Sequence, residues 1–100
     1  MANSKAARGA ILSGEKTVAA AGTAEALGTG FFRSIVVIAK VGNAGKVYIG
    51  GSDVASTTND GLSAGDSLTF STQSHTLDLA RIFIDVDTNG EGIDIYGIVG

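Results

Sequence analysis

Short runs in which apolar and polar residues alternate make up most of this 100-residue chain, and turns containing glycine separate the runs. Alternation with a period of two is typical of β-strands that bury one face. The strongest run, residues 32–41, contains the consecutive β-branched residues Ile35, Val36, Val37 and Ile38. Such a run predicts a strand that is buried on both faces or that uses its second face as an interface.

Several shorter segments also have the pattern of strands. Residues 46–50 alternate, with Val47 and Ile49 on one side and Tyr48 on the other, and residues 66–71 and 76–79 predict two more strands. Closely spaced glycines in residues 15–29 favour a strand, a turn at Ala21-Gly22 and a second strand at 24–27. Residues 51–65 predict a long polar loop. The total of seven to nine short strands predicts one all-β domain over residues 15–100, an antiparallel β-sandwich or a small jelly roll.

The C-terminal part has the pattern of a β-hairpin, with strands at residues 81–88 and 91–99 and a two-residue turn at Asn89-Gly90. Asn-Gly is favoured in such a turn because both central positions need positive φ. This register puts two apolar pairs on the core face, Val86 with Ile93 and Ile84 with Ile95. It puts two further pairs on the other face, Phe83 with Tyr96 and Asp85 with Asp94.

Residues 1–14 show neither a strand nor a helix period, and they carry Lys5 and Arg8 without an acidic residue. We interpret them as a flexible basic N-terminal arm, of which residues 9–13 could add a strand to a sheet. The apolar stretch 10–12 is too short for a secretory signal. No run approaches the ~20 apolar residues of a membrane-spanning helix, so a cytoplasmic origin is expected.

Composition narrows the possible functions. The chain has no cysteine, which excludes disulfides, zinc–thiolate sites and thiol nucleophiles. Residues 1–50 hold six basic and two acidic residues, whereas residues 51–100 hold one basic and eight acidic residues. Opposite patches of this kind can register one copy against another, although both signs can equally mix on the folded surface. The net charge of −3 argues against nucleic acid as a main partner.

Residues 85–91 (DVDTNGE) resemble the first half of a calcium-binding loop, with Asp85, Asp87 and Asn89 as candidate ligands. Tyr96 occupies the twelfth position, where a bidentate acid is needed, and the flanks are predicted strands rather than helices. A solvated hairpin tip accounts for Asn89-Gly90 without a metal. We therefore expect no metal and no cofactor.

The predicted outer face of the hairpin offers candidate interface residues. Like charges facing each other at Asp85 and Asp94 are destabilising, so a cation or a basic side chain is expected to offset them. Lys5 and Arg8 of a neighbouring copy are candidates, Arg81 is an intrachain candidate, and screening by solvent is the simplest alternative. The predicted outward-facing aromatic residues can anchor an interface or pack in a second layer. They are Tyr48, Phe83 and Tyr96.

His75 is the only histidine, so any histidine general base must be this residue. Ser71, Ser74 and Asp78 lie near it in the sequence, but nothing sets a nucleophile against a base. We therefore expect that the chain is not an enzyme.

Four segments follow one another in a recognisable order: residues 17–27 (TVAAAGTAEAL), 45–54 (GKVYIGGSDV), 59–70 (NDGLSAGDSLTF) and 82–96. This order resembles small all-β structural proteins of tailed-bacteriophage virions, and the resemblance covers about residues 15–98. Ala64 stands where proline is common in that pattern. Turn glycines and strand hydrophobics carry the likeness, and it brings no catalytic residue with it.

The resemblance implies a virion protein that is assembled in the host cytoplasm. Within that class it favours a capsid decoration or cement protein, a homo-oligomer, with a trimer favoured, that binds the major capsid protein or other virion proteins. The basic arm suits this role, since an extended segment can add to the edge of a neighbour's sheet. A head–tail connector, tail or baseplate component is the alternative within the virion. A carbohydrate- or ligand-binding β-sandwich is the alternative outside it, and neither nucleic acid nor membrane is expected as a partner.

Overall fold

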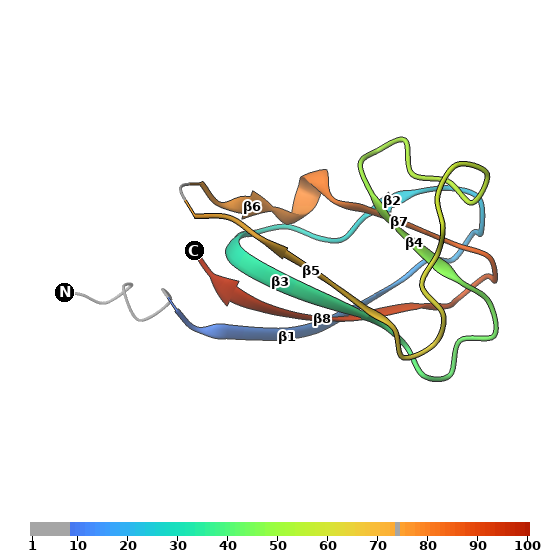
Figure 1. Cartoon of the computed structure of the whole chain (residues 1–100), viewed down its shortest axis with the longest axis horizontal. Helices are drawn as coiled ribbons and strands as arrows, with labels where there is room; N and C mark the ends of the chain where they lie inside the picture. The colour runs from blue at the N-terminus through green and yellow to red at the C-terminus, as the bar shows by residue number, and fades with distance from the viewer. Residues whose placement is uncertain (1–8, 74) are drawn as a thin grey trace.

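The computed structural model of the chain describes residues 9–73 and 75–100, which form two antiparallel β-sheets packed face to face (Figure 1). The five-stranded sheet has the order β1-β8-β3-β5, with β6 also paired to β3, and the three-stranded sheet has the order β2-β7-β4. The strands are β1 Ile11–Thr17, β2 Glu25–Ala26, β3 Phe31–Ala39, β4 Val47–Gly50, β5 Ser67–Ser71, β6 Leu77–Asp78, β7 Phe83–Val86 and β8 Gly92–Val99. A short 3-10 helix, η2, covers Leu79–Arg81. The expected all-β sandwich is confirmed.

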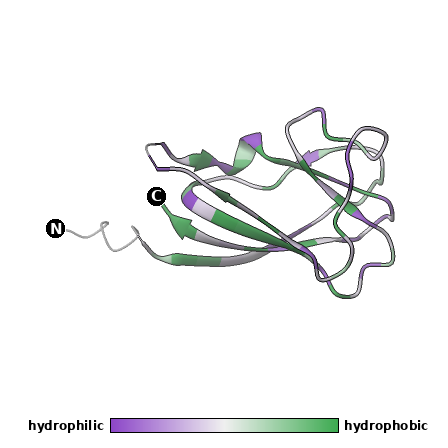
Figure 2. Cartoon of the chain, viewed as in Figure 1, coloured by the Kyte–Doolittle hydropathy of each residue, from purple (hydrophilic) through white to green (hydrophobic). Residues whose placement is uncertain are grey.

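The core lies between the two sheets and takes alternate residues from the long strands. In β3, Ile35, Val37 and Ala39 are fully buried, whereas Val36 and Ile38 on the opposite face are half-buried. Hydrophobic colour runs along β1, β3 and β8 in Figure 2. β3 is therefore not buried on both faces, and its outer face is partly open to solvent. The other buried core residues are Val18, Leu27, Phe32, Val47, Leu79, Ile84, Val86, Ile93 and Ile95.

Most of the expected strands are confirmed. Those expected at residues 46–50, 66–71 and 76–79 are present as β4, β5 and β6, and the expected turn at Ala21-Gly22 separates β1 from β2. Residues 51–65 form a loop that rejoins the small sheet through one bridge between Leu62 and Val47.

The expected C-terminal hairpin is wrong, because β7 and β8 lie in different sheets. β7 pairs with β2 and β4, whereas β8 pairs with β1 and β3. Ile84 and Ile95 are both buried, but they enter the core from opposite sheets instead of pairing side by side. The same is true of Val86 and Ile93.

The turn between β7 and β8 explains this difference. Gly90 has a φ of 84°, but Asn89 has no positive φ, so the pair lacks the two consecutive positive φ values of a type I′ hairpin turn. Instead the Gly90 N–H donates to the Val18 carbonyl (2.7 Å), and the Val18 N–H donates to the Glu91 carbonyl (3.0 Å). The end of β1 thus occupies the position beside residues 90–91 that β7 would hold in a hairpin.

β1 begins inside the segment expected to be an arm and crosses the boundary expected at residue 14. It pairs with β8 over seven residues, from Ile11 opposite Ile98 to Thr17 opposite Gly92. Just before it, the Gly9 N–H donates to the Val99 carbonyl (3.1 Å). The expectation that residues 9–13 could add a strand to a sheet is confirmed, and the sheet is the chain's own. Lys5 and Arg8 lie outside the described residues.

We expect Gly92→Ala to destabilise the sandwich by wedging β1 away from β8. A Cβ at Gly92 would overlap the Lys16 carbonyl oxygen and lie 2.7 Å from the Thr17 Cα, both of which are backbone atoms. Overpacking of this kind costs about 1–3 kcal/mol of the free energy of unfolding, which urea denaturation measures. Gly14→Ala in the same ladder is the control, because a Cβ there meets nothing within 4 Å. Equal losses in the two variants would contradict the close approach at Gly92.

Candidate functional site

Asp85 and Asn89, two of the three candidate calcium ligands, hold the turn between β1 and β2. Asp85 is buried (3% exposed), and its Oδ1 accepts hydrogen bonds from the Gly22 N–H (2.9 Å) and the Val86 N–H (2.8 Å). Asn89 Oδ1 accepts from the Ala21 N–H (2.8 Å). The turn is therefore fixed to the small sheet and to the β7–β8 connection at the same time.

Asp87 and Glu91 hold the connection between β3 and β4 in a similar way. Asp87 accepts from the Tyr48 hydroxyl (2.9 Å to Oδ1) and from the Lys46 N–H (3.2 Å to Oδ2). Glu91 accepts hydrogen bonds from the Ala44 N–H (2.6 Å) and from the Gly45 N–H (3.0 Å). Carboxylates that accept backbone N–H groups in this way make strong charge-assisted bonds.

These contacts give the calcium hypothesis no support. The side-chain oxygens of Asp85, Asp87 and Asn89 named above already accept N–H or O–H groups, so these residues have a role in the fold that needs no metal. Across residues 9–73 and 75–100, no group of three or more histidine or acidic side chains is placed to hold a metal ion. These side chains instead connect the β1–β2 turn and the β3–β4 connection to the β7–β8 connection, at one end of the sandwich.

The prediction that Tyr48 lies on an exposed face is wrong. Its side chain points away from the core face of β4, as expected, but it is only 6% exposed. The loop over residues 51–65 covers it so closely that a Cβ at Gly61 would lie 2.7 Å from the Tyr48 ring. Burial, with the Asp87 hydrogen bond as a second cause, raises the pKa of Tyr48.

The predicted pairs across the hairpin are also wrong, because their members belong to different sheets. Phe83 is half-buried on β7, while Tyr96 is 45% exposed on β8. Asp85 lies opposite Tyr48 on β4, and Asp94 lies opposite both β1 and β3. The five candidate interface residues within the described part of the chain therefore do not form one surface.

A pair of facing acids does exist, at another position. Asp94 on β8 lies directly opposite Glu15 on β1, and both face the solvent side of the large sheet. Lys40 bridges them, with its Nζ 2.7 Å from Asp94 Oδ1 and 2.6 Å from Glu15 Oε1. These two hydrogen bonds, that to Asp94 first, raise the pKa of Lys40 to about 12. The base that offsets this pair is thus in the same chain, and it is Lys40. Arg81 was a candidate partner for Asp85 and Asp94, a pair that does not form.

Sequence reasoning missed Glu15 and Lys40, because their meeting depends on how β1 and β3 pair with β8. The one sequence signal for this contact was the alternation of β8, which placed Asp94 on an outer face.

The outer face of the large sheet carries a contiguous set of apolar side chains, which we call the apolar outer surface. Ile11 (66% exposed) lies opposite Ile98 (38%), and Tyr96 (45%) lies opposite the half-buried Val36. Ile38 extends the set along β3. Glu15, Lys40 and Asp94 border it at one end. Of its members, Tyr96 and the outer face of β3 were candidates for an interface in the sequence, whereas Ile11 and Ile98 were not.

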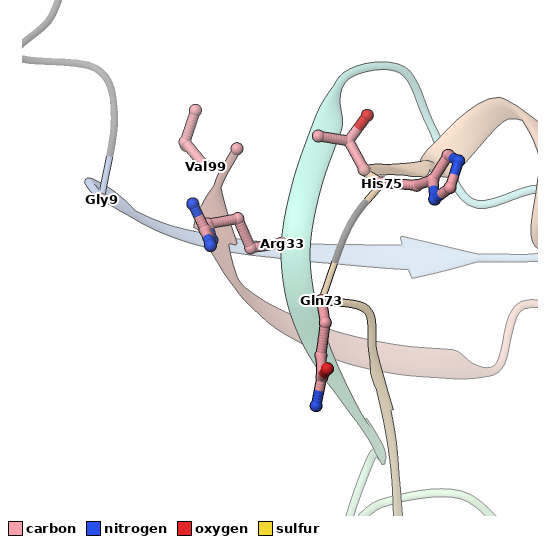
Figure 3. Close-up of a pocket in the computed structure, with 7 residues that line it drawn as sticks. Gly9, Arg33, Gln73, His75 and Val99 are labelled. Carbon is pink, nitrogen blue, oxygen red and sulfur yellow. The ribbon is translucent and has the colours of Figure 1, made fainter.

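A cavity of about 730 Å³ lies at the end of the sandwich near Val99, between β3 and the connection from β5 to β6. Its polar lining includes Arg33, Gln73 and His75. In Figure 3 these three side chains extend in different directions and do not converge on one point. The described residues around this cavity therefore do not assemble a set of ligand-binding groups.

Comparisons with family models, with curated proteins and with solved structures found no match to this chain. The fold itself defines a compact all-β domain of the β-sandwich class. In the part of the chain that the structure describes, there is no helix with the length and apolarity needed to cross a membrane.

We expect Asp85→Ala to lower the free energy of unfolding by about 1–3 kcal/mol, the usual cost of leaving buried hydrogen-bond donors without their acceptor. The variant leaves the Gly22 and Val86 N–H groups without the Asp85 oxygen. Thermal and urea unfolding measure the change. Asp85→Asn, which keeps an acceptor oxygen, should lose less, and Asp60→Ala on the exposed loop should lose little. A loss at Asp60 as large as at Asp85 would refute the role given to the Asp85 hydrogen bonds.

We expect Lys40→Gln to lower the melting temperature, because Glu15 and Asp94 then face each other without a cation. The loss should shrink as salt is added, since salt screens the repulsion. The raised pKa means that the contribution of Lys40 is complete below about pH 10.5 and is lost as the pH rises through about 12. Lys46→Gln is the matched control, because Lys46 has no ion pair among the described residues. A salt-independent loss would mean that Lys40 acts by packing alone.

Proposed function

We propose that this chain is a structural protein of a tailed-bacteriophage virion, and specifically a capsid decoration or cement protein. In this role it binds the outer shell as a homo-oligomer and stabilises the shell through protein–protein contacts. Its partner is the major capsid protein or another virion protein, and its location is the virion, assembled in the host cytoplasm. The resemblance of residues 15–98 to small all-β virion proteins is the starting point of this proposal.

The apolar outer surface is the observation that carries the proposal. Single exposed apolar residues are ordinary on protein surfaces, but a contiguous set over neighbouring strands is typical of a contact site. Ile11, Tyr96 and Ile98 come from two adjacent strands and lie beside Val36 and Ile38 of a third. The bordering cluster of Glu15, Lys40 and Asp94 gives this surface a polar rim, as protein interfaces have.

Other classes have less support in the described residues. A carbohydrate-binding module needs exposed aromatic side chains around a cleft, but Tyr48 is buried and Phe83 half-buried. The cavity beside Arg33 has no aromatic platform except the imidazole of His75. A connector, tail or baseplate component uses the same kind of contact surface, so copy number is what separates it from a decoration protein.

The test is the number of copies of this chain per purified virus particle, counted by quantitative mass spectrometry against the major shell protein. We expect near-stoichiometric amounts for a decoration protein. A few copies per particle would move the assignment to a connector, tail or baseplate part, and complete absence would refute the virion proposal.

Rebinding to stripped particles tests the surface itself. We expect Tyr96→Ala to weaken binding, because it truncates the aromatic side chain at the centre of the apolar outer surface. Val41→Ala, at a residue that is 86% exposed in the loop after β3, is the control and should bind as the wild type does. Charge reversal at Lys5 and Arg8 tests separately whether the N-terminal residues contribute to particle binding.

A further inference from the structure

The described residues of the two sheets give five edge strands, β1, β5, β6, β2 and β4, which differ in how much backbone they leave unpaired. β6 has only two residues. β2 has two residues, and β4 is bridged by the loop, since Val47 and Leu62 exchange both backbone hydrogen bonds (3.0 and 2.7 Å). β5 has five residues. β1 has seven, of which six are exposed. Within the described residues, β1 is therefore the longest open edge.

Hydrogen bonds at the two ends of β1 determine which backbone groups face outward. The Val99 N–H donates to the Ala10 carbonyl (2.9 Å), and the Val18 N–H donates to the Glu91 carbonyl (3.0 Å). Bonded and non-bonded positions alternate in an antiparallel ladder, and the β1–β8 register is unbroken, so the even-numbered residues of β1 bond to β8. The outward N–H and C=O groups belong to Ile11, Ser13, Glu15 and Thr17.

The β1 edge lacks three features that usually prevent an edge strand from pairing with a strand of another chain. Proline, bulges and free charges block edges in natural sheets. The chain has no proline, and the β1–β8 register contains no shift. Both charged residues of β1 are paired within the chain: Lys16 Nζ lies 2.8 Å from Glu25 Oε1, and Glu15 Oε1 lies 2.6 Å from Lys40 Nζ. β1 thus presents an open ladder whose own charges are neutralised.

We propose that β1 pairs with β1 of a second copy of this chain, antiparallel and about a two-fold axis at Gly14. In this register every outward-facing residue of one strand meets an outward-facing residue of the other, with Ile11 opposite Thr17 and Ser13 opposite Glu15. The two large sheets then form one continuous sheet. Because the same patch is used on both copies, the contact closes at two chains.

The side chains of β1 fit this register. No like charges face each other, since Glu15 meets Ser13 and Lys16 meets Leu12 of the second copy. Leu12 is 36% exposed in the single chain, and the aliphatic stem of Lys16 can cover it. An axis at Glu15 would instead set two carboxylates opposite each other. Gly14 leaves the axis clear, because even a Cβ there meets nothing within 4 Å.

This inference deepens the proposed function, because a decoration protein of this kind acts as an oligomer, and it rests on that function only for its role in the virion. A two-fold pair replaces the trimer that the family resemblance implies. A trimer needs β1 to meet a different surface of the next copy, for which the open β5 edge is the nearest candidate. The self-complementary register of β1 favours the pair.

The mass of the purified full-length chain in solution is the first test. By light scattering we expect twice the 10.0 kDa mass of one chain. Ser13→Pro removes an outward N–H and no hydrogen bond to β8, so it should keep the β-sheet circular dichroism spectrum and become monomeric. Ser13→Ala keeps the N–H and should remain dimeric.

A cysteine variant gives a second test that does not depend on how Ser13→Pro folds. The chain has no cysteine, so Gly14→Cys introduces a single thiol that meets its own copy at the axis, within the Cα separation that a disulfide needs. We expect mild oxidation to give disulfide-linked dimers. Thr69→Cys, on the β5 edge, is the matched control and should stay uncrosslinked.

Each outcome decides the matter. A monomer, a trimer, a Ser13→Pro variant that stays dimeric, or equal crosslinking from Gly14→Cys and Thr69→Cys overturns the pairing. A dimer whose chain is absent from particles keeps the pairing and removes the proposed function. A trimer that is abundant in particles keeps the proposed function and removes the pairing.

Discussion

The pairing of β1 with β8 is the interaction on which the rest of this fold depends. Because β1 lies along one side of β8 and β3 along the other, β7 has no place beside β8 as a hairpin partner and lies in the other sheet. That crossing is what creates two layers, and it brings Ile84 and Ile95 into the core from opposite sides. Two backbone bonds between Val18 and residues 90–91 fix the crossing where β1 ends. Without β1, the C-terminal residues have the local pattern of a simple hairpin.

The connections at one end of the sandwich are held by side chains rather than by strand pairing. Asp85, Asp87, Asn89 and Glu91 each accept N–H or O–H groups from a segment that is remote in sequence. A carboxylate that is buried needs such donors to offset its lost hydration. The chain has no disulfide, so these bonds supply part of the constraint that crosslinks give other small domains.

The two outer faces of the sandwich are not equivalent. The turn between β1 and β2 and the loop over residues 51–65 fold over the small sheet, where Asp85 and Tyr48 are buried beneath them. Among residues 9–73 and 75–100, none covers Ile11, Tyr96 and Ile98 of the large sheet in this way. Apolar contact area and an open strand edge therefore lie on the same sheet. This asymmetry makes the large sheet the side on which contact with other chains is expected.

Local sequence patterns were enough to predict the fold class, most of the strands and the burial of the apolar faces. Period-two alternation and turn glycines are local signals, and they hold whichever strands become neighbours. Which strand pairs with which depends on the tertiary structure. Asn89-Gly90 carries the local signal of a tight hairpin, yet the φ of Asn89 and the bonds to Val18 make it a connection between sheets.

The candidate site follows the same division. That acids facing each other need a base was deducible from the sequence, but which acids and which base was not. Glu15, Lys40 and Asp94 meet only through the registers of β1 and β3 against β8, and the first residues of β1 lay in a segment without strand periodicity. The register of strands far apart in sequence is set by the packing of the whole core, and no local pattern encodes it.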